Sequence, residues 1–545
     1  MIRGFRWVID RRPIFSQSGA GLAIFVTWFA FYMLTGSRER PWGDAQVMWD
    51  VAVSMADRGA VDIAFEWPPM SHKGEGGRVY SQYALLPSVV QLPGAYLWLL
   101  CKNSSASLAT FMWPFCCHLA PAACGAWVAS RFYSLSRRLG VGQRAAIVST
   151  VALCLSTGLW VYSRYAYSEA LQAACALGFV DALWRFCRDP RPRQALWFGV
   201  WAGLLVHAKL VFALSVGAAA VLATYVVWRN RRRGLLRCWL AALAGALPLA
   251  VIWGLYNHIR WGAWDMTGYE STVAMTAGES VLWGLWGLFG SPGKSVFLYN
   301  LPLVLAIFGW RRLATQERLF AASVAVTTVP VVLLYSSHLN WGGGYCWGPR
   351  YLLFAVPLWM FGFSTLCEPV GEGRFGSRLR ALCIVAALVC GGAVQVLGNA
   401  FYWDHYIRIA NEAKVQWLGS PDRSGARIPA RGRGHCDSCF EDMHALLWLP
   451  PFSPVEGHRW LLHHRLAGDD WRRAEQAAPW HRFTTKSVSI KRTYRRARWD
   501  WWVFLWLDDL PKYRALGIFL SCILALGVVA GATGWYVRTR PGDSG

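Results

Sequence analysis

Long uncharged apolar blocks alternate with short polar segments along most of the chain. Four of these blocks contain no Asp, Glu, Lys or Arg: residues 19–36, 238–257, 381–399 and 515–537. Each is long enough to cross about 30 Å of hydrocarbon as a helix. The pattern predicts an all-α polytopic membrane protein and excludes a soluble protein with a single membrane anchor.

About twelve segments have the composition of membrane spans. A further apolar stretch, residues 82–101, contains Pro87 and Pro93, and we expect it to form a broken helix in the outer interface. Counting it as a span would place the Arg residues after position 130 outside, although basic residues favour cytoplasmic loops. The predicted spans are residues 19–36, 107–130, 145–163, 168–184, 195–206, 210–228, 238–257, 295–310, 319–336, 351–367, 381–399 and 515–537.

The charge of the chain agrees with this topology. Lys and Arg outnumber Asp and Glu by 55 to 31, which gives a net charge of +24. Much of the excess is Arg in short loops, and all of these loops fall on the cytoplasmic side of the chosen topology. We therefore expect both chain ends in the cytoplasm and no nucleic-acid partner. The basic loops are residues 185–193, 229–237, 311–318 and 374–380.

Three larger pieces are expected on the outer side: loops 37–106 and 258–294, and a domain at 401–513. The alternating stretch 483–490 indicates strands, so we expect a small mixed α/β domain there. Residues 1–400 form the main transmembrane domain, and residues 514–545 form a final transmembrane helix with a cytoplasmic tail.

The apolar block 194–228 is too long for one span. As a single helix its 35 residues would extend about 52 Å, well beyond the membrane. His207 and Lys209 lie in its middle, so we expect a hairpin with its tip at the outer surface. Lys209 then either extends toward the interface or faces an anionic group.

Asp44 is the first candidate for chemistry, because it follows the first predicted span by eight residues. One interpretation is that its side chain caps a helix over residues 45–57, since Asp is a preferred N-cap. The other is that its carboxylate accepts a proton from a hydroxyl group. The two roles are compatible, and Asp50 is the second candidate for the base.

Other cations lie at the expected outer surface. A Gly-rich turn carries Lys73 and Arg78 and leads through Tyr83 into the predicted interfacial helix. Such a turn could hold a phosphate, but contact with lipid head groups explains it equally well. Lys294 and Arg350 follow Gly-rich segments, and each is either an interface anchor or a phosphate ligand.

Several motifs then resemble a known superfamily. Asp44 in the first outer loop and the run from Arg78 to Tyr83 before a Pro-containing interfacial helix resemble the GT-C membrane glycosyltransferases. The similarity is greatest to bacterial relatives of the protein O-mannosyltransferases and of the lipid A aminoarabinose transferases. It extends over about residues 1–400. Further motifs fall in matching places: residues 164–169, 203–209, 261–270, 287–294 and 341–351.

The resemblance implies transfer of a sugar, with inversion, from a polyprenyl-phosphate donor to an outer-face acceptor. It implies a multi-pass protein of the bacterial inner (plasma) membrane, whose catalytic domain is residues 1–400. The acceptor, a glycan, a lipid or a protein, is not specified. Asp44 would be the catalytic base. The implied substrate-binding residues are Lys73, Arg78, Tyr83, Glu169, Lys209, Asp265 and Arg350.

Some of these assignments have alternatives. Asp265 and Glu270 are also explained as solvated loop acids, with acceptor or metal contact as the second interpretation. Asp44 has no Asp-x-Asp partner, so we expect that no metal or other cofactor is required. Cys436 and Cys439 predict a short-loop disulfide, while zinc binding would need further ligands. Those ligands could come from His435, His444 or His458.

Two other functions are compatible with a polytopic chain. A transporter or flippase of lipid-linked sugars would show inverted repeats and broken helices near the midplane, and we find no convincing internal repeat. A non-catalytic membrane scaffold could keep the same fold without the chemistry. Asp44→Asn distinguishes these functions, because only the enzyme depends on the base.

Overall fold

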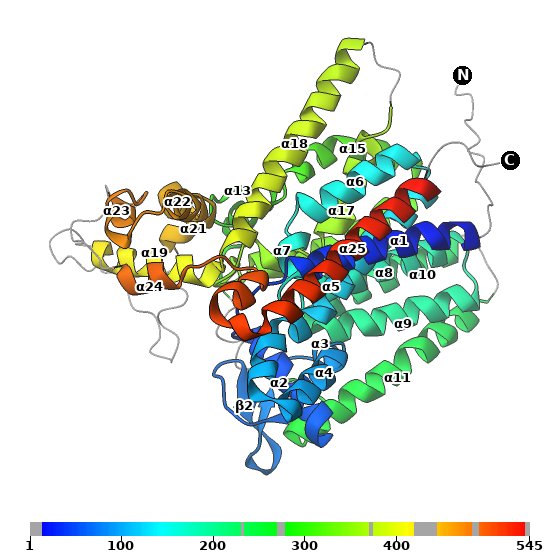
Figure 1. Ribbon diagram of the computed structural model, residues 1–545. Helices are drawn as coiled ribbons and strands as arrows, with labels where there is room; N and C mark the ends of the chain where they lie inside the picture. Colours follow the sequence, from blue (N-terminus) through cyan, green and yellow to red (C-terminus); the bar gives the residue numbers. More distant parts are fainter. Residues whose placement is uncertain are drawn as a thin grey trace.

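The computed structural model describes residues 14–229, 234–269, 278–369, 374–418, 444–481 and 490–539. Within them the chain is mostly helical, and the long helices run roughly side by side in one bundle (Figure 1). Seven of these helices are long and apolar enough to cross a membrane: Ala106–Arg138, Glu169–Arg188, Leu210–Arg229, Leu236–Trp261, Arg318–Ser336, Phe375–Ala400 and Pro511–Arg538. The expected multi-span helical membrane fold is confirmed in this form.

All twelve predicted spans coincide with helices, and seven of them correspond to the helices long and apolar enough to cross a membrane. The long helices are α5 (Ala106–Arg138), α8 (Glu169–Arg188), α10 (Ala213–Arg229), α11 (Leu235–Trp261), α16 (Arg318–Ser336), α18 (Arg374–Ala400) and α25 (Arg514–Arg538). The other five predicted spans coincide with α1 (Ile14–Leu34), α6 (Gln143–Leu155) with α7 (Leu159–Ser163), α9 (Pro192–Ala208), α14 (Val296–Tyr299) with α15 (Pro302–Gln316), and η3 (Arg350–Leu352) with α17 (Val356–Leu366). The number twelve therefore stays a prediction.

The stretch 82–101 forms two short helices rather than one. These are α3 (Leu86–Val89) and α4 (Leu92–Ser104), and Pro87 and Pro93 lie in their first turns. Proline is tolerated there because the first helical N–H groups have no partner within the helix. The expected break is thus present, and α4 packs on α5.

One end of the bundle collects the basic residues that the topology places together. Arg131 and Arg138 of α5 and Arg185 of α8 all contact the buried carboxylate of Asp181. The distances are 3.5 Å for Arg138 and 2.9 Å for Arg185. The end of α5 and the end of α8 therefore lie at the same end of the bundle, as two predicted spans between them require.

The block 194–228 breaks where the hairpin was expected. Helix α9 ends at Ala208, and Lys209 has an extended backbone with φ −166° and ψ 131°. The short turn η2 (Leu210–Phe212) then leads into α10. The backbone thus leaves the helical conformation at the charged residue.

In the first outer loop the helix expected over residues 45–57 is present, but the strands that follow it were not predicted. Helix α2 (Asp44–Arg58) is followed by β1 (Asp62–Ile63), β2 (Ser71–Lys73), η1 (Glu75–Gly77) and β3 (Val79–Ser81). The strands form an antiparallel sheet in the order β1-β3-β2, with Tyr80 opposite both Asp62 and His72. Val47, Val51 and Ile63 form a small apolar core beneath it.

The described part of 401–513 is helical and projects from the bundle (Figure 1). It contains one isolated antiparallel bridge, Phe401 to Trp499. The strands expected at 483–490 fall almost entirely outside the described residues, as do His435, Cys436, Cys439 and Glu270. The helices and turns are α19 (Trp403–Leu418), α21 (His444–Trp448), η5 (Pro450–Phe452), α22 (Pro454–Leu466), α23 (Trp471–Gln476), α24 (Lys491–Arg496), η7 (Leu505–Asp509) and η8 (Pro511–Tyr513). Before it, α13 (Val281–Gly290) packs on α16.

Candidate active site

Asp44 is the first residue of α2, and its carboxylate faces Arg350. Asp44 Oδ2 lies 3.0 Å from Arg350 Nη2, and the Asp44 side chain is 23% exposed. Gly43 occupies the N-cap position with φ +61° and ψ −130°, a conformation that glycine adopts most readily. No side chain of the described residues caps α2. The carboxylate expected to cap the helix is therefore directed into an ion pair.

Arg350 connects two carboxylates that are far apart in the sequence. Its Nη2 pairs with Asp44, and its Nε lies 4.0 Å from Oε1 of Glu169, the first residue of α8. The guanidinium also lies over two rings, 5.4 Å from the centroid of Tyr167 and 5.3 Å from that of Tyr351. An Arg held in this way is a fixed positive charge in a largely water-excluded site.

Lys209 lies on the same aromatic group. Its Nζ is 4.7 Å from the ring centroid of Tyr351 and 5.2 Å from that of Tyr335. The two rings are stacked with centroids 4.4 Å apart. Both Lys209 and Arg350 thus lie close to the ring of Tyr351.

The charges of the site hold Asp44 ionised. Burial by itself would raise the pKa of the Asp44 carboxyl. The Arg350 guanidinium, the hydrogen bond from Tyr83 and the charge of Lys209 outweigh burial and hold this pKa below its ordinary value. Burial likewise would lower the pKa of Arg350, but Asp44, Tyr351 and Glu169 raise it above its ordinary value.

Several polar atoms of the site have no hydrogen-bond partner within the described part of the chain. They are Arg350 Nε, Glu169 Oε2 and the Tyr335 hydroxyl, all buried. Unpaired buried polar atoms are costly, and they are rare except where water, an ion or a ligand completes them. The site is thus suited to an additional polar group between the cations and the ring hydroxyls.

Lys294 is not a free cation of this site. It is 1% exposed, and its Nζ donates to the carbonyl oxygens of Gly344 (3.1 Å) and Cys346 (2.8 Å). It also contacts Cys346 Sγ at 3.0 Å. Lys294 therefore holds the loop that ends at Arg350, a role that neither sequence interpretation included.

Three expected ligands lie elsewhere. Lys73 is exposed on β2, and Asp265 is exposed after α11. Arg78 is 67% exposed and lies 4.0 Å from Asp62. Asp50, the second candidate for the base, accepts a hydrogen bond from Gln46 at 2.6 Å. The structure thus groups Asp44, Tyr83, Glu169, Lys209 and Arg350 and leaves the roles of Lys73, Arg78 and Asp265 as predictions.

Two residues near the site were not singled out from the sequence. Tyr335 lies at the end of α16, where an aromatic residue is also expected as an interface anchor. Arg260 is 1% exposed and donates to the carbonyl oxygen of Ser81 (2.5 Å) and to that of Tyr83 (3.3 Å). Arg260 thus fixes the segment that carries Tyr83. In the sequence it is only a basic residue near the end of a predicted span, which does not indicate this role.

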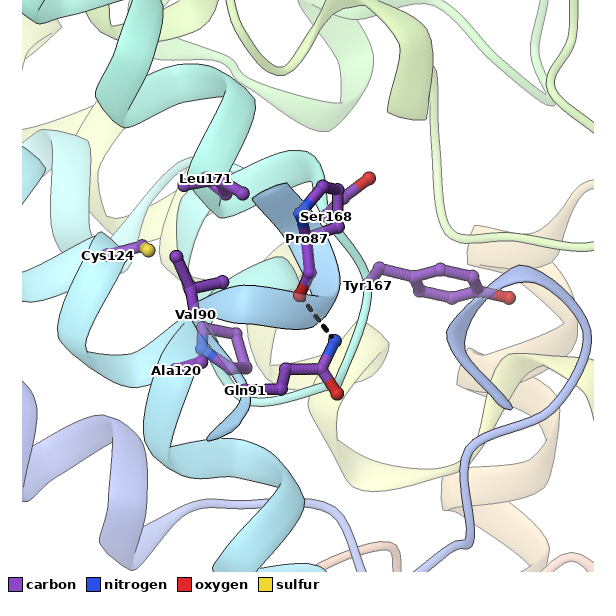
Figure 2. A pocket seen from close by; sticks show the side chains of 9 residues that line it. Pro87, Val90, Gln91, Ala120, Cys124, Tyr167, Ser168 and Leu171 are labelled. Carbon is purple, nitrogen blue, oxygen red and sulfur yellow. Dashed lines mark hydrogen bonds between the residues drawn. The ribbon is translucent and has the colours of Figure 1, made fainter. Parts of the chain in front are cut away.

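A small pocket adjoins the site (Figure 2). It lies between α3, α5 and the start of α8, and Tyr167 belongs both to its lining and to the ring group under Arg350. Gln91 Nε2 donates to the Pro87 carbonyl oxygen at 3.1 Å inside it. The lining residues are Pro87, Val90, Gln91, Ala120, Pro121, Cys124, Tyr167, Ser168 and Leu171.

The described residues contain no group of three or more His, Cys, Asp or Glu side chains that could hold a metal ion. His458, a possible zinc ligand, is buried and its Nδ1 bonds to the Leu397 carbonyl oxygen at 2.8 Å. The proposed partners of His458, Cys436 and Cys439, lie outside the described residues, so the disulfide stays a prediction.

Comparisons with known proteins give similar solved structures, among them two of ArnT. No protein-family model and no curated protein matches the sequence. The crystal structure of ArnT from Cupriavidus metallidurans bound to undecaprenyl phosphate has a TM-score of 0.45 and 14% identity, covering 94% of this chain and 77% of that chain. ArnT in the apo state gives 0.45 and 13%, covering 96% and 75%.

ArnT is a GT-C lipid A aminoarabinose transferase, one of the two groups that the sequence motifs resemble. The match extends over most of the chain at low sequence identity. This similarity is too low to transfer a residue role, so the role of each side chain must follow from its contacts within this chain.

Proposed function

We propose that this protein is a membrane glycosyltransferase that uses a polyprenyl-phosphate sugar as donor. The observation that carries the proposal is the pairing of one carboxylate, Asp44, with one fixed cation, Arg350, at 3.0 Å, with Lys209 on the adjoining ring. Asp44 is the general base. Arg350 and Lys209 bind the lipid phosphate, and Glu169 orients Arg350.

The reaction is a single displacement. The acceptor hydroxyl gives its proton to Asp44 as its oxygen forms a bond to the anomeric carbon of the donor. The bond from that carbon to the phosphate oxygen breaks, the electron pair leaves with the polyprenyl phosphate, and the anomeric configuration inverts. Negative charge grows on the leaving phosphate, where Arg350 and Lys209 stabilise it more strongly in the transition state than in the ground state.

Arg350 Nε and the Tyr335 hydroxyl support a phosphate at this position, because both are hydrogen-bond donors without a hydrogen-bond partner in the described part of the chain. A planar guanidinium binds a phosphate through two N–H groups, while the Lys209 ammonium acts as a point charge. A phosphate there would complete the site without moving either cation far. The donor is therefore placed by groups that are already fixed.

Donor binding also changes the base. In the structure Arg350 holds the Asp44 carboxylate, and this contact lowers the pKa of Asp44. A phosphate that binds some of the Arg350 N–H groups weakens the contact between Arg350 and Asp44. The pKa of Asp44 then rises, and the carboxylate accepts a proton more readily. The base becomes effective only after the donor has bound, which disfavours proton abstraction without a sugar to transfer.

The reaction is placed on the extracytoplasmic face of the membrane. The basic residues around Asp181 lie at the far end of α8 from Glu169, and basic loops favour the cytoplasm. A lipid-linked donor suits that face, where a nucleotide sugar is not supplied. The chain requires no metal or other cofactor in this scheme.

Asp44→Asn and Asp50→Asn form a matched pair of test variants on one helix. Undecaprenyl phosphate, the lipid bound to ArnT, serves as the probe for the donor site. We expect D44N to bind the probe and to lose about 10²–10⁴-fold in transfer, the range for removal of a general base, while D50N stays active. Transfer is followed by mass spectrometry of envelope glycans and lipids with and without each variant.

Three outcomes contradict the proposal. Unchanged sugar transfer by D44N removes Asp44 from the mechanism. Undecaprenyl phosphate that binds equally well to wild type and to a double variant of Arg350→Met and Lys209→Met removes the phosphate site. Movement of a lipid-linked sugar across vesicles without any transferred product indicates a flippase instead.

A further inference from the structure

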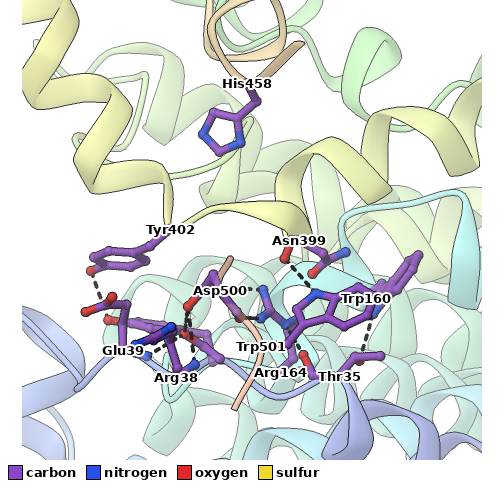
Figure 3. A network of polar contacts seen from close by, with 12 residues as sticks. Thr35, Arg38, Glu39, Trp160, Arg164, Asn399, Tyr402, His458, Asp500 and Trp501 are labelled. Atoms are coloured by element: carbon purple, nitrogen blue, oxygen red, sulfur yellow. Dashed lines mark hydrogen bonds and ion pairs between the residues drawn. The ribbon is translucent and has the colours of Figure 1, made fainter. Parts of the chain in front are cut away.

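The outer segment that follows α24 reaches back to the transmembrane bundle and ends in a buried ion pair (Figure 3). Asp500 is 1% exposed and Arg164 is fully buried. Arg164 Nη1 lies 3.2 Å from Asp500 Oδ2, and Arg164 also donates to the carbonyl oxygens of Thr35 and Asp500. Two distant parts of the chain thus make three contacts with the guanidinium.

Asp500 is fixed by the segments beside it. Its Oδ1 accepts a hydrogen bond from Ser37 Oγ at 2.6 Å and another from the Arg38 N–H at 3.2 Å. The Asp500 N–H donates to the Ala400 carbonyl oxygen at 2.9 Å. One residue of the outer domain therefore joins the end of α1, the end of α18 and Arg164.

Arg164 begins the 164–169 turn between α7 and α8, and this turn ends in the candidate active site. At its start, the Ser37 N–H donates to the Arg164 carbonyl oxygen at 3.1 Å. The Tyr165 hydroxyl donates to the Tyr402 hydroxyl at 2.9 Å. At its end, Tyr167 lies under the Arg350 guanidinium and Glu169 lies 4.0 Å from Arg350 Nε. The two residues that contact Arg350, Tyr167 and Glu169, thus follow Arg164 by three and five positions.

We propose that Arg164 and Asp500 are positioning residues, through which the outer domain at 401–513 holds the 164–169 turn and thereby Arg350 in place to bind a lipid phosphate. This inference rests on the proposed function, because it assumes that Arg350 binds the phosphate of the donor. A buried charge is stable only when it is paired and hydrogen-bonded, so the turn takes this position only with Asp500 inserted. The outer domain is then part of the machinery that shapes the site, whether or not it also contacts the acceptor.

The test uses two mild variants and one matched control in the full-length protein. Arg164→Lys keeps the charge but cannot reach Thr35 and both Asp500 oxygens at once. Tyr165→Phe removes only the bond to the Tyr402 hydroxyl and one to the Arg40 carbonyl oxygen. Arg465→Lys is the control, since Arg465 lies in the same outer domain and bonds to the Tyr494 carbonyl oxygen instead.

Two readouts are measured on folded protein. Hydrogen exchange of the peptide covering residues 164–172 is expected to speed up in R164K and Y165F and to stay unchanged in R465K. The Kd for undecaprenyl phosphate is expected to rise about 10-fold in R164K, and less in Y165F, because small displacements of the binding residues strongly weaken ligand binding. A role in stability alone would lower the melting temperature but leave the Kd of the folded protein unchanged.

The outcomes separate this inference from the proposed function. Unchanged exchange of residues 164–172 in folded R164K and Y165F overturns the positioning role. Faster exchange with an unchanged Kd also overturns it, because the turn would then not act on Arg350. If wild type does not bind undecaprenyl phosphate, the proposed phosphate site fails, and the exchange of the turn alone decides whether Asp500 holds it.

Discussion

At the scale of single residues, the ionisation of Asp44 depends on three partners that come from different outer segments. Arg350 follows the Gly-rich loop after α16, Tyr83 follows β3, and Lys209 lies in the break between α9 and α10. Each of them favours the carboxylate over the neutral acid. A change at any one partner should therefore appear in the pH dependence of the reaction before it appears in the fold.

Tyr83→Phe tests this dependence directly. Burial raises the pKa of Asp44, while Arg350 and the hydrogen bond from Tyr83 lower it, so loss of that hydrogen bond raises the pKa and the base is protonated at a higher pH than in the wild type. We expect the acid limb of the pH–rate profile to move to higher pH, with activity near that of wild type above pH 8. Tyr256→Phe is the control, since the Tyr256 hydroxyl bonds to the Tyr83 carbonyl oxygen and not to Asp44. An acid limb that stays in place would contradict the role of Tyr83.

Glu39 lies close to the Asp500 ion pair, and its pKa is shifted in the opposite direction from that of Asp44. Burial first, and then the charge of Asp500, raise the pKa of Glu39 from 4.5 to about 7. A raised carboxyl pKa means that folding favours the protonated form, so stability is highest below about pH 4.5 and falls as the pH rises through 7. Glu39→Gln should raise the melting temperature by a few degrees at pH 8 and change it little at pH 4.5. The exposed Glu66→Gln should change neither, and an equal shift at both pH values would contradict this explanation.

At the scale of elements, the start of α2 decides where the base lies. Gly43 has φ +61° and ψ −130° just before Asp44, and Gly59 has φ +65° and ψ 20° just after the helix. A Cβ at Gly43 would also contact the Met70 side chain at 3.5 Å, whereas one at Gly59 would meet nothing within 4 Å. Substitution of either glycine strains the backbone, but only substitution of Gly43 can also displace Asp44. Comparing the two variants therefore distinguishes the two effects.

Gly43→Ala should lower both stability and turnover, while Gly59→Ala should lower stability alone. Each forces a side chain into a left-handed backbone, which costs about 1–3 kcal/mol. Only G43A can relax by moving Asp44 away from Arg350, so we expect a loss of about 10²-fold in turnover, as for a displacement near 1 Å. Thermal unfolding and turnover per folded molecule measure the two effects. Equal turnover in both variants would show that the start of α2 does not set the position of the base.

The elements also show how far the sequence could be interpreted. Helices of about twenty apolar residues give a strong signal, so the seven helices long enough to cross a membrane were all predicted as spans, and Pro87 and Pro93 marked the starts of α3 and α4. The first-loop sheet was missed because its strands have two or three residues, too few for an alternating pattern. Arg350 and Asp44 could each be suspected, but their pairing joins residues more than 300 positions apart and required the structure.

At the scale of the whole molecule, the ends of the helices sort into two groups. Arg131, Arg138 and Arg185 meet at Asp181, and Arg538 of α25 bonds to the Gly19 carbonyl oxygen at the start of α1. The opposite ends of the same helices lead into the site and the outer domain (Figure 1). Ser130, in the second half of α5, also donates to the Gly21 carbonyl oxygen near the start of α1 at 2.8 Å. This contact is consistent with α3 and α4 not crossing the membrane, because a crossing would put the start of α1 and the end of α5 on opposite sides.

Reporter fusions test that topology. The turn at Gly140 follows α5, and Gly262 follows α11. Alkaline phosphatase, which is active only outside the cytoplasm, should be inactive when fused after Gly140 and active after Gly262, while a fluorescent protein should show the reverse. If α3 and α4 crossed the bilayer, every later segment would change sides, and phosphatase would be active at Gly140. That result would move Asp44 and Arg350 to opposite faces and remove the shared site on which the proposed reaction depends.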